Sequence, residues 1–180
     1  MNRRWLVAAL AVLAAAPPAV AHTPYGQWVV YRKKHLLIGS HRADLRTYVL
    51  AKTVAAILRA HLPEAQARVA RAPNAYRLAS LVGTDQMDVV VLAWADAAGM
   101  FKGEGEFKPY GAIALRLLAS LGDRALLAHA RVPARHAWLV SAALGDEPLA
   151  QGGLPADGTV VPWHPGSLAF REGKPEPAAD

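Results

Sequence analysis

Residues suited to binding an anion lie close together near the start of the chain. Gly39-Ser40 follows the apolar run HLLI, and the charged residues Arg42 and Arg46 precede an apolar-periodic segment. A helix starting there would present unpaired backbone N–H groups and the positive end of its dipole, and arginine side chains suit a carboxylate. We predict that this junction binds a small carboxylate. The alternative is a strand-to-helix turn whose arginines face water.

Histidines are the other residues with potential chemistry, since the chain has seven of them and no cysteine. No two are four residues apart, which excludes the paired-histidine zinc motif of helices. His22 would become the first residue after the export cleavage described below, where its amine and imidazole could chelate copper. We therefore list His22 as a candidate copper ligand. Its position could equally be an accident of the cleavage site, in which case the protein needs no cofactor.

No catalytic constellation is visible in the sequence. Ser40 and His41 are neighbours, but adjacency alone does not make a nucleophile and its base. The chain has no nucleophile elbow, no phosphate-binding glycine loop and no paired-carboxylate motif. We therefore predict that the protein is not an enzyme.

The first 21 residues have the pattern of a secretory signal. Arg3 and Arg4 precede an apolar run, and Ala19-Val20-Ala21 is a suitable cleavage motif. We predict cleavage after Ala21 and a periplasmic protein, although an uncleaved membrane anchor would look similar. The formal charge of the whole chain is +6 and is spread along it, so we do not expect a nucleic-acid partner.

Residues 22–172 are expected to form one α/β domain, followed by a polar, disordered tail at 173–180. Strands are expected at 35–39, 67–72, 87–93 and 124–132, with a brief extended piece at 159–163. Helices are expected from residue 44 or 47 to 62, at 75–82, from 96 onward, at 113–121, at 133–144 and near 166–173. Loops are expected at 145–158 and at 99–111, where glycines suggest mobility. The alternation favours a mainly parallel sheet flanked by helices.

Several of these segments resemble the solute-binding receptors of TRAP transporters, specifically those of the TAXI type. Those receptors begin with a strand, a Gly-Ser turn and a Thr-Tyr that opens a long helix, and this chain has LLIGSHRADLRTYVLAKTVAAIL. They tend to end on a histidine-proline-glycine helix, and this chain has PWHPGSLAFREG. The resemblance implies a periplasmic-binding-protein-like lobe. It also implies a set of ligand-binding candidates: Gly39, Ser40, Arg42, Arg46, Thr47, Tyr48, Asn74 and Asp96.

Two of these candidates have simpler explanations. Asn74 could be a plain N-cap for the helix that starts at Ala75. Asp96, together with the preceding Trp94, could belong to a helix start and to core packing. His164 lies in the closing motif and is expected to fix that turn.

The chain also departs from the family. The receptors have two lobes and about twice this length, and here the second lobe is absent from the sequence. The Gly-Ser turn is followed by the bulky HRADLR in place of a short glycine-rich connection. We therefore expect weak carboxylate binding by one lobe, or a protein partner on the face that the second lobe would cover. That partner could be a TRAP-type membrane subunit, a component of another periplasmic system, or a second copy of the chain.

Overall fold

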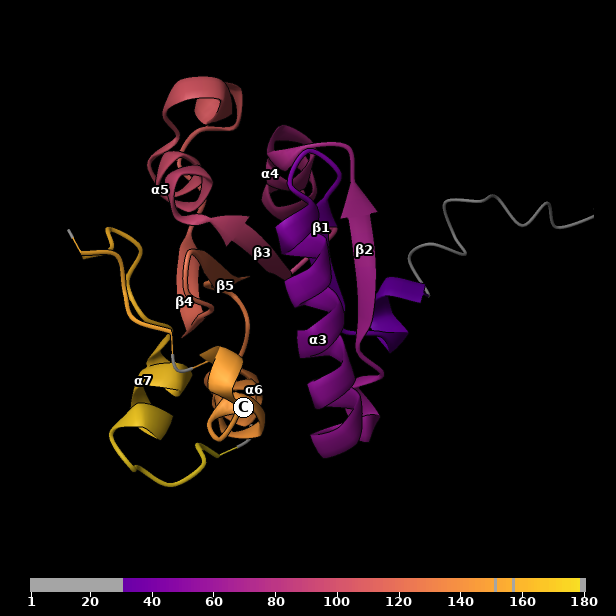
Figure 1. Ribbon diagram of the computed structural model, residues 1–180, viewed down its shortest axis with the longest axis vertical. Coiled ribbons are helices and arrows are strands. Elements are labelled where there is room, and N and C mark those ends of the chain that lie inside the picture. Colours follow the sequence, from indigo (N-terminus) through magenta and orange to yellow (C-terminus); the bar gives the residue numbers. More distant parts are fainter. Residues whose placement is uncertain (1–30, 151, 157, 179–180) are drawn as a thin grey trace, which may run out of the picture. The chain divides into compact units, whose positions relative to one another are not determined.

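The computed structural model describes residues 31–150, 152–156 and 158–178 (Figure 1). The elements below belong to one compact unit, Arg32–Asp180. The predicted signal peptide, its cleavage site and His22 lie outside the described residues. None of the described helices is long and apolar enough to cross a bilayer.

Five strands and five α-helices have defined bounds among the described residues, and residues 31–34 are also helical. The strands are β1 (Leu37–His41), β2 (Arg68–Ala72), β3 (Val89–Ala93), β4 (Leu115–Ser120) and β5 (Arg124–His129). The helices are α3 (Leu45–His61), α4 (Ala75–Gly83), α5 (Trp94–Lys102), α6 (Ala134–Leu144) and α7 (Pro165–Arg171). Three short 3-10 helices are η1 (Pro63–Ala65), η2 (Gly105–Tyr110) and η3 (Pro148–Ala150).

The strands form one mixed sheet in the order β2-β1-β3-β5-β4. β1 pairs in parallel with both β2 and β3, whereas β5 runs antiparallel to β3 and to β4. β4 therefore points the same way as β1, β2 and β3, and only β5 is reversed. The predicted α/β class with a mainly parallel sheet is confirmed.

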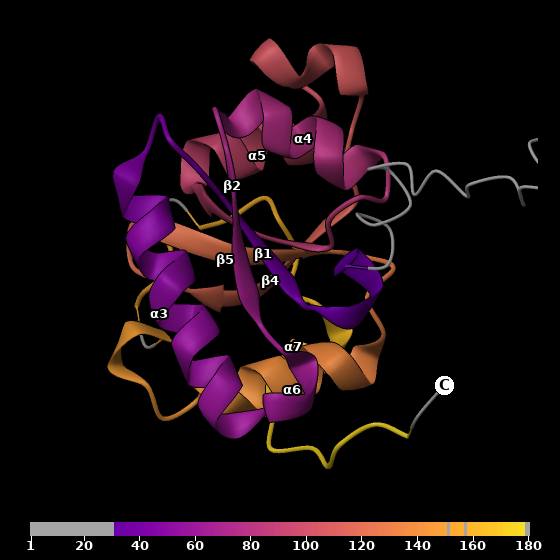
Figure 2. The same cartoon turned by 90° about the vertical axis from the view of Figure 1, so that its right-hand side faces the viewer.

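Helices cover both faces of the sheet (Figure 2). One core cluster joins α4, α5 and η2 to the sheet through residues such as Leu78, Met100 and Phe107. The other cluster joins α3 and α6 to the opposite face through residues such as Val54 and Leu144. This three-layer arrangement leaves open the two sides of the sheet at which the strands begin and end.

The sequence of α3 explains how the helix is placed. Asp44 caps its start by accepting a hydrogen bond from the Arg46 backbone N–H (3.0 Å), and it ends just before Pro63. Val54 and Leu58 are fully buried. The buried face of the helix also includes Ala51 and Ala55.

The prediction of a helix at 113–121 is wrong, because this segment forms strand β4. Leu117 belongs to the core under α4 and α5, and Leu118 to the core under α3 and α6. Both faces of the strand are thus buried, and the alternation that identifies a half-buried strand is missing. The free edge of β4 is covered by residues 162–164, where the Leu117 N–H donates to the Pro162 carbonyl (2.8 Å).

Two other segments also differ from the predictions. β1 continues to His41, so Gly39 and Ser40 lie inside the strand and do not form a turn. The glycine-rich segment 99–111 holds the end of α5 and the 3-10 helix η2, whose Phe107 is buried in the core.

The segment after α7 makes contacts with α6. The Trp138 indole N–H donates to the Lys174 carbonyl (3.1 Å), and Arg135 pairs with Glu176 (2.5 Å).

Candidate functional site

The predicted binding residues gather at one edge of the sheet, where four parallel strands end. We call this the carboxyl edge; its strand ends are His41, Ala72, Ala93 and Ser120. The chain passes from β1 outward to β2 and then back across to β3, so the strand order reverses between β1 and β3. In open α/β sheets, ligands bind outside the carboxyl ends of strands at such a reversal.

Gly39 is part of the packed sheet and lies away from solvent. A Cβ on Gly39 would lie 2.3 Å from the Met87 sulfur and 2.9 Å from Val90 Cγ1, so glycine is required there by the close approach of the core. Ser40 is fully buried on the opposite face of the strand, where its hydroxyl makes a long contact with the Ala70 carbonyl (3.4 Å). Neither Gly39 nor the Ser40 hydroxyl is open to a ligand in this structure.

The β1–α3 connection supplies two arginines with different surroundings. Arg46 is exposed and pairs with Asp123 in the β4–β5 turn (3.2 Å). Arg42 is also exposed, and within the described part of the chain it makes no ion pair. Of the two arginines, Arg42 is therefore the one that is available to bind an anion.

Thr47 and Tyr48 both have partners within the fold. The buried Thr47 hydroxyl donates to the Asp44 carbonyl (2.7 Å) and accepts from the His41 backbone N–H (3.3 Å), which fastens the start of α3 to the end of β1. The Tyr48 ring lies 4.4 Å from the Arg71 guanidinium. These contacts give Thr47 a structural role and place Tyr48 over the outer strand β2.

Asn74 caps helix α4, as the simpler explanation predicted. Its side-chain oxygen accepts a hydrogen bond from the Arg77 backbone N–H (2.9 Å). The residue lies at the carboxyl edge beside the β1–α3 connection, because the Ala43 N–H donates to the Pro73 carbonyl next to it (3.2 Å).

His41 is the most unusual residue at this edge. It ends β1, is 3 % exposed, and neither of its ring nitrogens has a hydrogen-bond partner. Strand alternation places its side chain with Gly39, on the face covered by α4 and α5. Its Nε2 lies 3.9 Å from Asp96 Oδ2 in the first turn of α5, which is too far for a hydrogen bond.

Burial disfavours the charged forms of both His41 and Asp96. Burial lowers the pKa of His41, although the nearby carboxylates of Asp96 and Asp44 oppose this effect. Burial also raises the pKa of Asp96, against the opposing effect of His41. At neutral pH the imidazole is therefore neutral, and its contact with Asp96 is a charge–dipole contact without an ion pair. A ligand carboxylate beside His41 would favour the protonated ring.

An ion-pair network lies near enough to His41 to affect its pKa. Arg124, at the start of β5, donates to Asp44 Oδ2 (2.6 Å) and to Asp123 Oδ2 (2.9 Å). Burial raises the pKa of Asp44, but the Arg124 guanidinium and the backbone N–H groups of Arg46 and Thr47 outweigh it and hold this pKa below its usual value. The network ties α3 to the β4–β5 turn and engages Arg124 and Arg46.

The arrangement offers binding groups without an evident nucleophile. Ser40 and His41 point to opposite faces of β1, so the His41 ring cannot activate the Ser40 hydroxyl. Among the residues that the structure describes, no group of three or more His, Asp or Glu side chains could hold a metal ion. The copper hypothesis concerns His22 and remains a prediction.

Two residues of this site could not be identified from the sequence as binding residues. The signal for His41 was its position two residues beyond the predicted strand at 35–39, and a strand two residues longer would have placed it at the edge. Arg124 gave no signal, because it meets Asp44 across 80 positions of sequence. The sequence matches no known protein-family model and no curated protein at a significant level. The family resemblance thus rests on the quoted motifs alone.

Proposed function

We propose that this chain is a solute-receptor-like binding protein that holds a small carboxylate weakly at the carboxyl edge of its single lobe. The observation that carries the proposal is the buried His41 ring, whose two nitrogens have no partner at the point where the strand order reverses. An unpartnered buried polar group costs about 1–3 kcal/mol. A ligand that supplies the missing partner would recover part of that free energy.

The same edge provides the complementary charge for a carboxylate. Arg42 makes no ion pair among the described residues. The N-cap residue of α5 is Ala93, which has no side chain that could cap the helix, so the backbone N–H groups of the first turn lack a side-chain acceptor there. Asp96 is next to these groups, but burial raises its pKa and so weakens its repulsion of an anion.

Three facts support weak binding. Arg46 and Arg124 are already paired with aspartates, both His41 nitrogens are buried, and binding by a single lobe, as proposed, would leave one side of the ligand in water, where charge interactions are screened. We expect a dissociation constant near the millimolar range, about −4 kcal/mol. Export to the periplasm and a relation to TRAP transport belong to the same proposal.

A protein partner is the second candidate function for this edge. Leu45 and Val49, one turn apart on α3, are 62 % and 54 % exposed. Large apolar side chains grouped on a surface are typical of protein contacts, and these two lie beside the β1–α3 connection. A membrane subunit or a second copy of the chain could cover them.

NMR titration of the ¹⁵N-labelled protein with glutamate and 2-oxoglutarate separates the two functions. Carboxylate binding predicts chemical-shift changes at residues 39–47 and 93–96. The affinity obtained from them should be several-fold weaker for Arg42→Gln. Arg68→Gln is the matched control, because Arg68 is an exposed arginine at the other end of β2. If residues 39–47 do not shift at high ligand concentration, carboxylate binding is wrong and the protein-partner function is favoured.

A further inference from the structure

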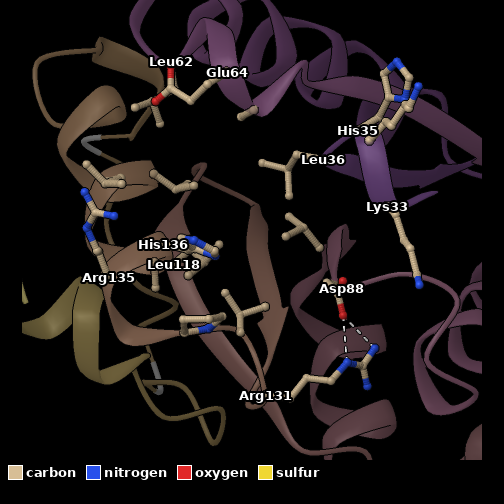
Figure 3. Close-up of a pocket in the computed structure, with 18 residues that line it drawn as sticks. Lys33, His35, Leu36, Leu62, Glu64, Asp88, Leu118, Arg131, Arg135 and His136 are labelled. Carbon is tan, nitrogen blue, oxygen red and sulfur yellow. Dashed lines mark hydrogen bonds and ion pairs between the residues drawn. The ribbon is translucent and has the colours of Figure 1, made fainter. Parts of the chain in front are cut away.

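A second concavity lies at the opposite edge of the sheet, far along the strands from His41. It has a volume of about 640 Å³ and is bounded by residues 33–36, 62–65, 88–89 and 131–140, with Leu118 (Figure 3). The groove therefore opens between the C-terminal end of α3 and the first turns of α6, where β1 and β3 begin. Pockets of roughly 300–1,000 Å³ are the usual size for small-molecule sites. None of the carboxyl-edge residues lines it.

The interior of the groove is apolar. Side chains of Leu36, Leu62, Leu118 and Val140 line it, and Figure 3 shows Leu36 and Leu118 between the charged residues at the rim. Val140 and Leu118 are themselves part of the core under α3 and α6. An apolar ligand body could therefore continue the core of the protein outward.

The rim of the groove is basic. Lys33 and Lys34 are exposed and make no ion pair among the described residues. Arg131 is engaged by Asp88 (2.7 Å), which leaves Glu64 as the acid of the lining without an ion pair in the described chain. The two free lysines thus outnumber the one free carboxylate.

The first turn of α6 adds to this positive field. Pro133 stands at the N-cap and has no side chain to accept a hydrogen bond, and the first turn contains no acidic residue. It carries His136 and Arg135 instead, both of which line the groove, and Arg135 is already paired with Glu176 (2.5 Å). The backbone N–H groups of this turn and the positive end of the helix dipole would therefore favour an anion in the groove.

We propose that this groove binds an amphipathic monocarboxylate, with its apolar body on the Leu36–Leu118 floor and its carboxylate at the lysine rim. The ligand proposed for the carboxyl edge is a small polar acid, so the two sites would take different classes of ligand. The two sites lie at opposite ends of the strands, so the groove can bind its ligand whether or not the carboxyl edge binds one.

Titration of the ¹⁵N-labelled protein with decanoate, below its micelle-forming concentration, tests the proposal. We expect shifts at residues 62–65 and 132–140, with 1-decanol and butyrate each binding at least about ten-fold more weakly. The first comparison removes the charge and the second removes most of the apolar body. Equal binding of decanol would show that the basic rim has no role and would overturn the proposal, as would decanoate shifts located only outside the groove.

Charge variants locate the carboxylate. Lys33→Gln/Lys34→Gln should weaken decanoate binding by about five-fold, as expected for losing two exposed charge pairs. Lys52→Gln/Lys108→Gln removes the same charge outside the groove lining and should leave the affinity unchanged. All four lysines are exposed or lie on surface helices, and circular dichroism checks that each variant is folded. An equal loss in both double variants would mean a general charge effect and would contradict the proposal.

Discussion

Replacing His41 by leucine should make the protein more stable. The imidazole is 3 % exposed, and neither ring nitrogen has a partner. A buried polar group left unsatisfied costs about 1–3 kcal/mol, and an apolar side chain of similar size removes that cost. Part of the gain is lost with the 3.9 Å contact to Asp96. We expect His41→Leu to raise the free energy of unfolding by about 1–2 kcal/mol, or Tm by about 2–8 °C for a chain of this length.

The assay is thermal and urea unfolding followed by circular dichroism, with His164→Leu as the control. His164 is just as buried, but its Nε2 lies 3.0 Å from the Val132 carbonyl and its Nδ1 accepts from the Gly166 N–H. Losing these bonds should destabilise the control by about 1–3 kcal/mol. If His41→Leu is destabilised as much as His164→Leu, then His41 has hydrogen-bond partners and our account of the site is wrong.

The pH dependence of stability gives the same variant a second test. Burial lowers the folded pKa of His41, while Asp96, Asp44 and Glu106 oppose this and Arg124 reinforces it. Below the ordinary histidine value of about 6.5 the unfolded chain binds a proton that the folded chain does not, so stability falls as the pH drops towards the folded pKa. The wild type should therefore lose more stability than His41→Leu between pH 7 and pH 5. Parallel curves would contradict the lowered pKa.

Two further predictions concern the residues that hold this edge together. Gly39→Ala should cost about 1–3 kcal/mol in urea unfolding by overpacking, because its Cβ would lie 2.3 Å from the Met87 sulfur; a neutral effect would show that β1 is not packed as described. Asp44→Ala should cost about 1–3 kcal/mol, since it removes an N-cap and the 2.6 Å Arg124 pair. The folded pKa of Asp44 is held below its usual value, so its stabilisation is present above about pH 4 and is lost at lower pH. The free energy of unfolding of the variant should therefore fall less steeply below about pH 4 than that of the wild type. The same steepness in both proteins would contradict this assignment.

Local signals were sufficient to predict most of the fold. Asp44 was one of the two expected helix starts, an N-cap was the simpler explanation for Asn74, and three adjacent valines identified β3, because capping and strand propensity act over a few residues. Strand β4 was missed because packing on both faces removes its alternation. Local sequence contains no information on which neighbours a strand will have.

The candidate site could be predicted only in part, for the same reason. The family resemblance named Arg42 and Asp96 as ligand-binding candidates, but the end of β1 was predicted two residues early, which hid His41. The pairing of Arg124 with Asp44 depends on the β4–β5 turn approaching α3, which no local pattern indicates. The groove at the opposite edge is built from five separate segments and could not be predicted before the fold was known.

The most direct test of the central claim is the pKa of the His41 imidazole, measured by long-range ¹H–¹⁵N NMR with and without a saturating small carboxylate. Our account predicts a pKa below the ordinary histidine value in the free protein, because burial disfavours the charged ring. It predicts a higher pKa with the carboxylate bound, because the ligand charge favours the protonated ring. An unchanged His41 pKa in the presence of ligand would contradict carboxylate binding at this site.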